Sequence, residues 1–186
     1  MTVVALRDFI GLTAARAWLS GGCALDLWLG QPSRAHEDID VSVLSEDWRL
    51  VVESLPSWIG LFAAEKGQLW PIDASEQPPP SNTWCEDVRT GEMVLQINAE
   101  TGSESCWIYR RNSAVTLPWS DALSEVDGLP IVAPAVQMLW KSKSPGAKDE
   151  SDWDVVIPKL GLDQRRWLSA SIRVAHPESP WAQRLP

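Results

Sequence analysis

A short strand, a pair of glycines, a helix and a second strand follow one another near the start of this chain, and this order constrains its fold more than any other feature. Ala17 to Ser20 is a short apolar segment typical of a strand, and Gly21-Gly22 ends it. Residues 24–29 predict a helix that ends at Gly30. After a polar loop that contains a proline, residues 38–44 alternate polar and apolar side chains, which is the period of a strand.

The remainder of the chain mixes strands with helices at first and becomes helical in its last third, which is typical of an α+β (α/β-like) protein. We expect a single domain over residues 1–186, with a mixed β-sheet core over residues 1–120, flanked by helices, and a helical part over residues 130–186. Further strands are predicted over residues 59–65, 92–99 and 106–109, a stiff proline-rich loop over residues 77–82, and helices over residues 3–17, 47–55, 134–143, 149–159 and 163–175.

Tryptophan is the main aromatic residue of this chain, with 12 Trp against two Phe and one Tyr. Large apolar rings bury much surface, so we expect most of them in the core. The candidates for the core are Trp18, Trp28, Trp107, Trp140 and Trp153. Trp70 and Trp84, near the proline-rich loop, are the candidates for rings that stack on a small molecule.

The chain has a net charge of −9 that is distributed unevenly. Residues 1–105 hold six basic and 16 acidic side chains, whereas residues 106–186 hold ten basic and nine acidic ones. A negative protein is a poor sequence-independent binder of DNA or RNA, because such a binder must neutralise phosphates. The uneven distribution is either chance or a sign that acids of the first part hold cations while bases of the second part meet an anion.

The sequence shows none of the usual features of a membrane or secreted protein. No apolar run approaches the roughly 18 residues needed to span a bilayer, and Asp8 interrupts the stretch where a signal peptide would continue its apolar region. Cys23, Cys85 and Cys106 are odd in number and form no C-x-x-C pair, which disfavours a disulfide framework and a zinc site. We therefore expect a protein of the reducing cytoplasm, without a membrane or nucleic-acid partner.

The glycine pair and the second strand carry the residues with the clearest chemistry. Glycines before a helix let backbone N–H groups approach an anion, and the helix N-terminus adds a partial positive charge. Asp38 and Asp40 stand two residues apart, so on a strand they share a face, and a divalent cation such as Mg²⁺ would remove their repulsion. Each feature alone is ordinary, because a glycine pair usually marks a turn and two aspartates on an edge strand are usually solvated.

Together these residues carry a family resemblance. Gly21-Gly22 followed by Asp38-Ile39-Asp40 resembles the signature of the polymerase-β-type nucleotidyltransferase superfamily. Residues 22–26 and 34–40 are similar to small bacterial antibiotic nucleotidyltransferases that act on aminoglycosides or lincosamides. The later segments that resemble uncharacterised bacterial relatives of those enzymes are residues 107–111, 127–130, 133–134, 139–141 and 148–153.

The resemblance implies a mechanism and a set of site residues. In such enzymes Mg²⁺ ions held by two acids bind a nucleoside triphosphate, an acceptor hydroxyl attacks the α-phosphate, and pyrophosphate leaves. The resemblance therefore implies that Asp38 and Asp40 are catalytic and bind two Mg²⁺ ions. The nucleotide-binding residues that it implies are Ser20, Gly21, Gly22, Arg34, His36, Lys141 and Lys148.

Three further polar residues have structural interpretations. Asp149 and Asp152 recur together in the family-like segment and are interpreted as orienting or capping groups. His176, which precedes Pro177 at the end of a predicted helix, is interpreted as a surface or capping residue.

The superfamily usually supplies a third carboxylate from a later strand, and that position falls here on Gln96. A glutamine cannot accept the proton of an acceptor hydroxyl and is a poor Mg²⁺ ligand. Gln96, Asn98 and Glu100 share one face of the predicted strand. The candidate substitutes are Glu100, which we take as the third catalytic residue if the strand register allows it, and otherwise Asp73 or Glu92.

The function that these features predict is Mg²⁺-dependent transfer of a nucleoside monophosphate, AMP from ATP, to a hydroxyl of a small molecule, with antibiotics among the acceptors. Gln96 motivates the alternative of a catalytically silent nucleotide- or partner-binding domain. A third alternative is a nucleotidyltransferase that modifies a protein, as in toxin–antitoxin relatives. The sequence leaves the acceptor, the base preference and the oligomeric state open.

Overall fold

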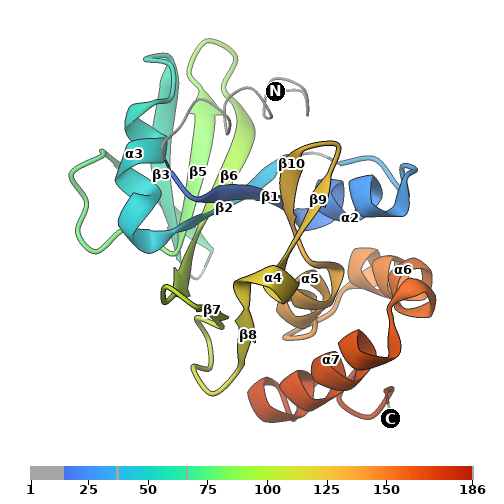
Figure 1. Ribbon diagram of the computed structural model, residues 1–186. Coiled ribbons are helices and arrows are strands. Elements are labelled where there is room, and N and C mark those ends of the chain that lie inside the picture. The colour runs from blue at the N-terminus through green and yellow to red at the C-terminus, as the bar shows by residue number, and fades with distance from the viewer. Residues whose placement is uncertain (1–14, 37, 66, 186) are drawn as a thin grey trace. The chain divides into compact units, whose positions relative to one another are not determined.

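The computed structural model describes residues 15–36, 38–65 and 67–185, which form two compact units (Figure 1). Unit 1 contains the described residues up to Ser20 together with His36–Thr101. Unit 2 contains Gly21–Ala35 and the described residues from Gly102 onward. The chain therefore leaves unit 1 at the end of its first strand, returns to it at His36, and leaves it again after Thr101.

Unit 1 is a mixed β-sheet with one α-helix among its described residues. Its elements are β1 (Ala17–Ser20), β2 (Asp40–Leu44), the 3-10 turn η1 (Ser45–Asp47), α3 (Trp48–Glu53), β3 (Ile59–Glu65), β4 (Gln68–Ile72), β5 (Asn82–Asp87) and β6 (Glu92–Gly102). These strands pair in the order β4-β3-β5-β6-β2-β1. β2 and β6 run parallel, and the other pairs of unit 1 are antiparallel. A central parallel pair therefore brings the start of β2 beside the middle of β6.

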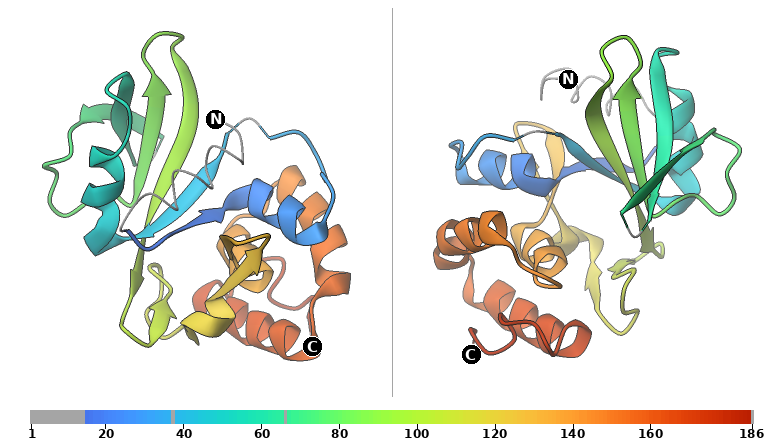
Figure 2. Two further views of the ribbon diagram at one scale, coloured as in Figure 1. Left: turned by 45° about the horizontal axis from the view of Figure 1, so that its top comes forward. Right: turned by 180° about the vertical axis from the view of Figure 1, so that it is seen from behind.

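Alternating side chains give this sheet two different faces. Val41, Val43 and Ile97 lie on one face and are fully buried. Helix α3 packs against that face, where Trp48 Nε1 donates a hydrogen bond of 3.0 Å to Thr83 Oγ1 (Figure 2). The opposite face carries polar side chains such as Asp40, which are half-buried.

Unit 2 combines two antiparallel strand pairs with helices. Its elements are α2 (Gly21–Leu29), β7 (Cys106–Ile108), β8 (Thr116–Pro118), α4 (Trp119–Ala122), β9 (Leu123–Val126), β10 (Leu129–Val132), α5 (Pro134–Lys141), α6 (Ala147–Val156), the 3-10 turn η2 (Ile157–Lys159) and α7 (Leu162–Ala175). β7 pairs with β8, and β9 pairs with β10. Asp127 and Gly128 join β9 to β10 with φ angles of 50° and 77°, as a type I′ hairpin turn requires.

Tryptophan rings fill much of the core of both units. Five of them are buried, namely Trp18, Trp48, Trp107, Trp153 and Trp181. Trp153 and Trp181 pack together with ring centroids 4.4 Å apart. The prediction of core positions is thus confirmed for Trp18, Trp107 and Trp153, whereas Trp28 and Trp140 are half-buried. Trp70 is exposed on the edge strand β4, and Trp84 is half-buried.

The α+β class predicted from the sequence is confirmed, and several element boundaries shift. The strands predicted over residues 17–20 and 59–65 match β1 and β3, but the helix predicted from residue 24 begins at Gly21. Ala17, predicted as the end of a helix over residues 3–17, belongs to β1 instead; most of that predicted helix lies outside the described residues. The strands β4, β5, β8, β9 and β10 were not predicted, because each is short and most border proline or polar residues that weaken the period.

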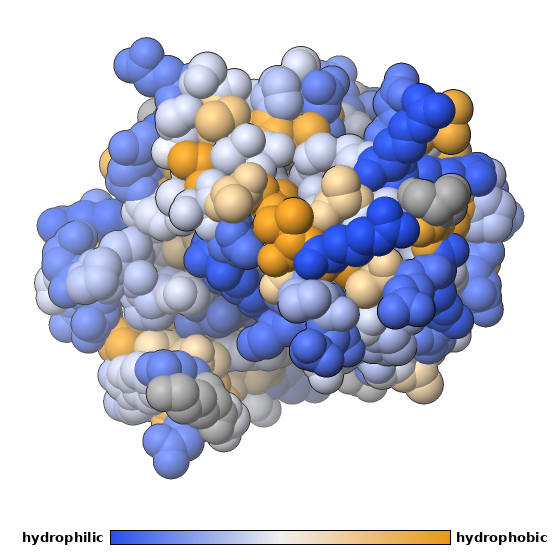
Figure 3. Space-filling view, turned by 90° about the horizontal axis from the view of Figure 1, so that it is seen from below, coloured by the Kyte–Doolittle hydropathy of each residue, from blue (hydrophilic) through white to orange (hydrophobic). Residues whose placement is uncertain are grey.

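The described surface shows no sign of a membrane-spanning segment. None of the described helices is long and apolar enough to cross a membrane. On the face of the molecule shown in Figure 3, hydrophilic side chains predominate and separate the hydrophobic ones.

Candidate functional site

The two predicted metal ligands lie at the start of β2 in unit 1. Asp40 is the first residue of the strand, opposite Ser20 of β1 and Gln96 of β6. Asp38 lies in a bend before the strand, so the prediction that both acids stand on the strand is correct for Asp40 alone. The bend does not interrupt the backbone pairing, because Gln96 N donates a hydrogen bond of 2.8 Å to Ile39 O. Both carboxylates are half-buried.

A row of carboxamides connects Asp40 to the neighbouring strands. Asn98 Nδ2 donates to Asp40 Oδ1 at 3.3 Å, and Gln96 Nε2 donates to Asn98 Oδ1 at 3.1 Å. Asn82 Nδ2 of β5 also donates to Asn98 Oδ1. Buried or half-buried polar groups need such partners, and here they order the side chains around one carboxylate oxygen. The sheet face that holds Asp40 therefore carries a connected row of polar side chains.

The strand register confirms that Gln96 lies beside Asp40, at the position predicted for the third acid. Glu100 pairs instead with Leu44 and is 1% exposed. It stands four residues along β6 from Gln96, or about 13 Å at roughly 3.3 Å per residue. The register therefore does not allow Glu100 to replace the missing carboxylate at Asp40, contrary to the expectation that made it the third catalytic residue.

The other two candidate acids also lie away from Asp40. Asp73 follows β4, and three strands separate β4 from β2. Hydrogen bonds from the Ser75 hydroxyl and backbone amide hold the pKa of Asp73 below its usual value. Glu92 is exposed at the far end of β6 and pairs with Asp87. Among the described residues no three His, Cys, Asp or Glu side chains come together as a metal site.

The glycine turn begins α2, and its conformation requires glycine. Gly21 has a φ of +71°, in the left-handed region that glycine adopts without strain. Its backbone N–H donates a buried hydrogen bond of 2.8 Å to Gln137 Oε1 of α5. Gln137 thus satisfies the first of the N–H groups that a helix start leaves without an internal partner. No local pattern could point to Gln137, because it stands 116 residues away along the chain.

Ser20, the last residue of unit 1 before this turn, has a buried hydroxyl. It accepts a hydrogen bond of 3.0 Å from Ser42 Oγ on β2. Ser20 therefore fixes β1 to β2 through its side chain. His36, at the return of the chain to unit 1, is half-buried.

Arg34 and Lys141, two predicted phosphate-binding residues, belong to a buried ionic cluster of unit 2. Lys141 Nζ lies 2.7 Å from Asp149 Oδ1 and 2.9 Å from Asp152 Oδ2. Arg34 Nε lies 3.5 Å from Asp152 Oδ1, and the Asp152 side chain is 2% exposed. The cluster joins the loop after α2 to helices α5 and α6.

The interpretation of Asp149 and Asp152 as capping and orienting groups is confirmed. Asp149 Oδ2 accepts a hydrogen bond of 2.9 Å from Gly146 N, which caps the start of α6. Asp152 orients the two cations Arg34 and Lys141. Lys148, in the first turn of α6, is exposed.

His176 occupies the C-cap position of α7, as predicted, and also contacts a buried phenol. Its Nε2 shares a hydrogen bond of 2.7 Å with the Tyr109 hydroxyl, which accepts another of 3.0 Å from Arg111 Nη1. Burial lowers the pKa of His176, and the positive charges of Arg111 and Lys143 lower it further. The imidazole is therefore held in its neutral form at pH 7.

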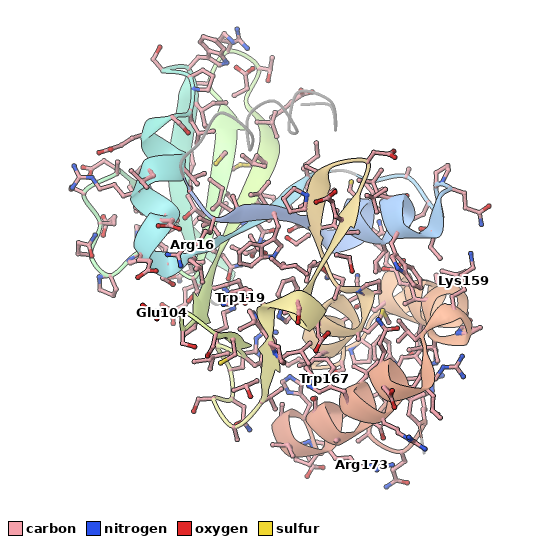
Figure 4. The ribbon with its side chains drawn as sticks, in the orientation of Figure 1. Arg16, Glu104, Trp119, Lys159, Trp167 and Arg173 are labelled. Carbon is pink, nitrogen blue, oxygen red and sulfur yellow. The ribbon has the colours of Figure 1, made fainter. Side chains whose placement is uncertain are left out.

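A cavity of about 440 Å³ opens in unit 2 beside α7. It has the size of many small-molecule sites. Trp167 of α7 lines it, and its Nε1 donates a hydrogen bond of 3.2 Å to Thr116 O (Figure 4). The other lining residues are Leu117, Ser120, Asp121, Leu123, Ser124, Ala135, Asp163 and Gln164. The wall thus combines an indole ring, hydroxyl groups and two carboxylates.

Comparisons with known proteins agree with this architecture. A family model described as aminoglycoside-2''-adenylyltransferase matches residues 2–64, which include the glycine turn and both aspartates. A search of curated protein sequences finds no significant match.

Solved structures of antibiotic-modifying enzymes share the fold. The solution structure of the antibiotic-resistance factor ANT(2'')-Ia has a TM-score of 0.57 at 17% identity, over 94% of this chain and 89% of that chain. Lincomycin-bound LnuA, a lincosamide antibiotic adenylyltransferase, has a TM-score of 0.56 at 18% identity, over 82% of this chain and 90% of that one. ANT(2'')-Ia with adenylyl-2''-tobramycin has a TM-score of 0.56 at 16% identity, over 90% and 91%. The fold is that of these adenylyltransferases, and the expected resemblance to polymerase-β-type nucleotidyltransferases is confirmed.

Proposed function

We propose that this chain is a nucleotidyltransferase that moves AMP from ATP to a hydroxyl group of a small molecule. The observation that carries the proposal is the position of Asp40 at the start of β2, opposite Gln96 of the parallel strand β6, in a fold shared with antibiotic adenylyltransferases. Asp38 stands two residues before it, so two half-buried carboxylates lie close together along the chain. Carboxylate oxygens are the ligands that Mg²⁺ prefers in proteins.

Asp38 and Asp40 would hold the divalent cation and through it the triphosphate. The donor set supports this role, because Asn98 Nδ2 orients the Asp40 carboxylate through a hydrogen bond to Oδ1. Bound Mg²⁺ would neutralise the two acids and withdraw charge from the phosphate oxygens. In the transfer, the acceptor oxygen forms a bond to the α-phosphorus while the bond from that phosphorus to the bridging oxygen breaks. Pyrophosphate leaves, and the hydroxyl proton passes to water because Gln96 cannot accept it.

Residues of unit 2 would bind phosphate groups in different ways. Gly22 and Lys148 would contribute an amide and a positive charge, whereas Gln137 already occupies the Gly21 amide. Arg34 and Lys141 are both paired with Asp152, so they would contribute mainly through where their positive charges are held rather than as unpaired hydrogen-bond donors. His36 remains a candidate nucleotide contact in unit 1.

The acceptor class rests on the structures that share the fold. One is described as a lincosamide antibiotic adenylyltransferase with bound lincomycin, and another contains adenylyl-2''-tobramycin. Hydroxyl-bearing antibiotics of this kind are therefore the first acceptors to test. The three cysteines carry thiols rather than disulfides, which supports a cytoplasmic setting.

Two alternatives remain within the same fold. Gln96 beside Asp40 favours a domain that binds Mg²⁺-nucleotide but transfers it slowly or not at all. A nucleotidyltransferase that modifies a protein would use the same acids with a different acceptor.

The experiment is to incubate the protein with Mg²⁺, ATP labelled at the α-phosphate, and a panel of aminoglycosides and lincosamides. The proposal expects pyrophosphate release and label on a small molecule, and loss of both in Asp38→Asn and Asp40→Asn. Asp73→Asn is the matched control, because Asp73 lies away from Asp40 and its side chain accepts hydrogen bonds from Ser75. Label on a protein band would favour the enzyme that modifies a protein, and nucleotide binding without turnover would favour the domain that binds nucleotide without transferring it.

A further inference from the structure

The face of the unit 1 sheet that carries Asp40 also carries two aromatic rings. Paired positions of neighbouring strands share a face, so the registers define a row of side chains across the sheet. Asp40 of β2 pairs with Gln96 of β6. Gln96 pairs in turn with Trp84 of β5, and Trp84 pairs with Phe62 of β3. At about 4.8 Å per strand, Trp84 therefore stands about 10 Å from Asp40 along this row.

The two faces of the sheet differ in burial at this row. On the face that packs against α3, Thr83 and Cys85 stand on either side of Trp84 along β5 and are 0% exposed. On the face of Asp40, both Trp84 and Phe62 are half-buried. Large rings that a fold leaves partly exposed are informative, because their full burial would have stabilised the fold. Trp84 and Phe62 thus form an aromatic surface that begins next to Gln96.

A glycine makes room for the second ring of this aromatic surface. Gly60 stands two residues before Phe62 on β3 and therefore on the same face of the sheet. A Cβ atom at Gly60 would lie 3.4 Å from Phe62 Cε2 and 3.1 Å from Val88 Cγ1. The Phe62 ring therefore lies along β3 over Gly60, where a larger residue would displace it. The glycine thus extends the aromatic surface along β3.

The geometry of the transfer places the acceptor on the side of Asp40 where the aromatic surface lies. In phosphoryl transfer the attacking and leaving oxygens stand roughly in line, on opposite sides of the phosphorus. The glycine turn to which the phosphates are assigned follows Ser20, and Ser20 pairs with Asp40 from β1. The acceptor therefore approaches from the other side of β2, where β6, β5 and β3 follow in the strand order.

The side chains around Trp84 offer the groups that a sugar ring needs. An indole face contacts the apolar C–H groups of such a ring, and the carboxamides of Gln96 and Asn82 beside it exchange hydrogen bonds with hydroxyl groups. We propose that Trp84, with Phe62 beside it, binds a sugar ring of the acceptor and so determines which acceptors bring a hydroxyl to Asp40. This inference rests on the proposed function, because it assumes transfer to a small molecule.

The test measures acceptor binding by isothermal titration calorimetry in the unmodified protein and in Trp84→Ala, both saturated with Mg²⁺ and α,β-methylene-ATP. The probes are lincomycin and tobramycin, the antibiotics found free or adenylylated in the structures that share the fold. For each probe that binds the unmodified protein, we expect the Kd to rise at least about tenfold in Trp84→Ala, which is what the loss of about 60 Å² of buried apolar contact corresponds to. Trp84→Phe, which keeps a ring, should recover most of the affinity.

Trp70→Ala is the matched control, because it removes a tryptophan from the opposite face of the same sheet. Trp70 pairs with Ala63, which is buried on the face that packs against α3. The control should change the affinity for probe and nucleotide by less than about twofold, as surface substitutions away from a site do. Trp84→Ala should also leave the nucleotide affinity unchanged, whereas a general disturbance of the sheet would weaken both ligands. Trp84→Leu replaces Trp84→Ala if circular dichroism shows that the latter is unfolded.

Four outcomes overturn the inference while leaving the proposed function intact. They are a smaller rise in Kd than expected in the folded Trp84 variant, an equal rise in Trp70→Ala, weaker nucleotide binding in Trp84→Ala, and binding of nucleotide without binding of either probe. A complete lack of Mg²⁺-dependent nucleotide binding in the unmodified protein overturns the inference and the proposed function together.

Discussion

The buried carboxylate of Asp152 gives the sharpest prediction for stability. Its side chain is 2% exposed, and it contacts Lys141 Nζ at 2.9 Å and Arg34 Nε at 3.5 Å. Asp152→Asn keeps the size of the side chain and removes its charge. The change leaves the half-buried Arg34 guanidinium without its acid and Lys141 with Asp149 alone. It thus perturbs the electrostatics of unit 2 without opening a cavity.

The expected loss is at the lower end of the range for a broken buried ion pair. Removing one partner of such a pair costs several kcal/mol, and because Lys141 retains Asp149 we expect about 3 kcal/mol here. For a chain of this length, that lowers the melting temperature by roughly 6–12 °C. The free energy should be measured by urea unfolding and the melting temperature by calorimetry.

Asp163→Asn is the control for the loss of an acid as such. Asp163 is also in unit 2 and also pairs with an arginine, Arg166, at 3.5 Å, but its side chain is 97% exposed. An exposed pair of this kind contributes little, so the control should change the free energy of unfolding by less than about 0.5 kcal/mol. If Asp152→Asn costs no more than Asp163→Asn, the ionic cluster does not stabilise unit 2 and Arg34 and Lys141 are available for ligands.

Two further predictions concern titration and thiol reactivity. Burial, Arg111 and Lys143 lower the pKa of His176, so nuclear magnetic resonance should find it below 6.5, and a value at or above 6.5 would contradict the contacts described. The unfolded chain then binds more protons than the folded chain just below pH 6.5, so the contribution of His176 to the free energy of unfolding is present above that pH. This contribution is lost as the pH falls towards the pKa of His176 in the folded chain. His176→Gln should remove this pH dependence. Cys85 is 0% exposed and burial raises the pKa of its thiol to about 12, whereas Cys23 and Cys106 are half-buried. Iodoacetamide at pH 8 followed by mass spectrometry should therefore modify Cys85 far more slowly than the other two in the folded protein, and at a similar rate only in urea.

The features that could be predicted best are the helices and strands that depend on residues close together along the chain. The strand before Gly21, the helix after it and the strand that contains Asp40 follow from local patterns that the fold preserves. The position of Gln96 followed from the family resemblance, and the parallel register of β2 and β6 places it opposite Asp40. The edge strand β4 was not predicted because Pro71 interrupts the alternation of its polar and apolar side chains. A proline inside a strand is tolerated at the edge of a sheet, where β4 lies.

The partners of the site residues could not be predicted, because they depend on tertiary contacts. Gln137 caps Gly21 from 116 residues away, and Asn98 orients Asp40 from 58 residues away. Glu100 failed as a substitute acid because register, which no single strand pattern reveals, places it beside Leu44.

The central claim is that Asp38 and Asp40 belong to a site for Mg²⁺-nucleotide. Isothermal titration calorimetry with ATP, in the presence and absence of Mg²⁺, tests it most directly in the unmodified protein and in Asp40→Asn. We expect Mg²⁺-dependent binding that Asp40→Asn abolishes while the variant keeps its fold. No binding at millimolar ATP, or equal binding in the unmodified protein and in Asp40→Asn, would show that these acids do not form such a site.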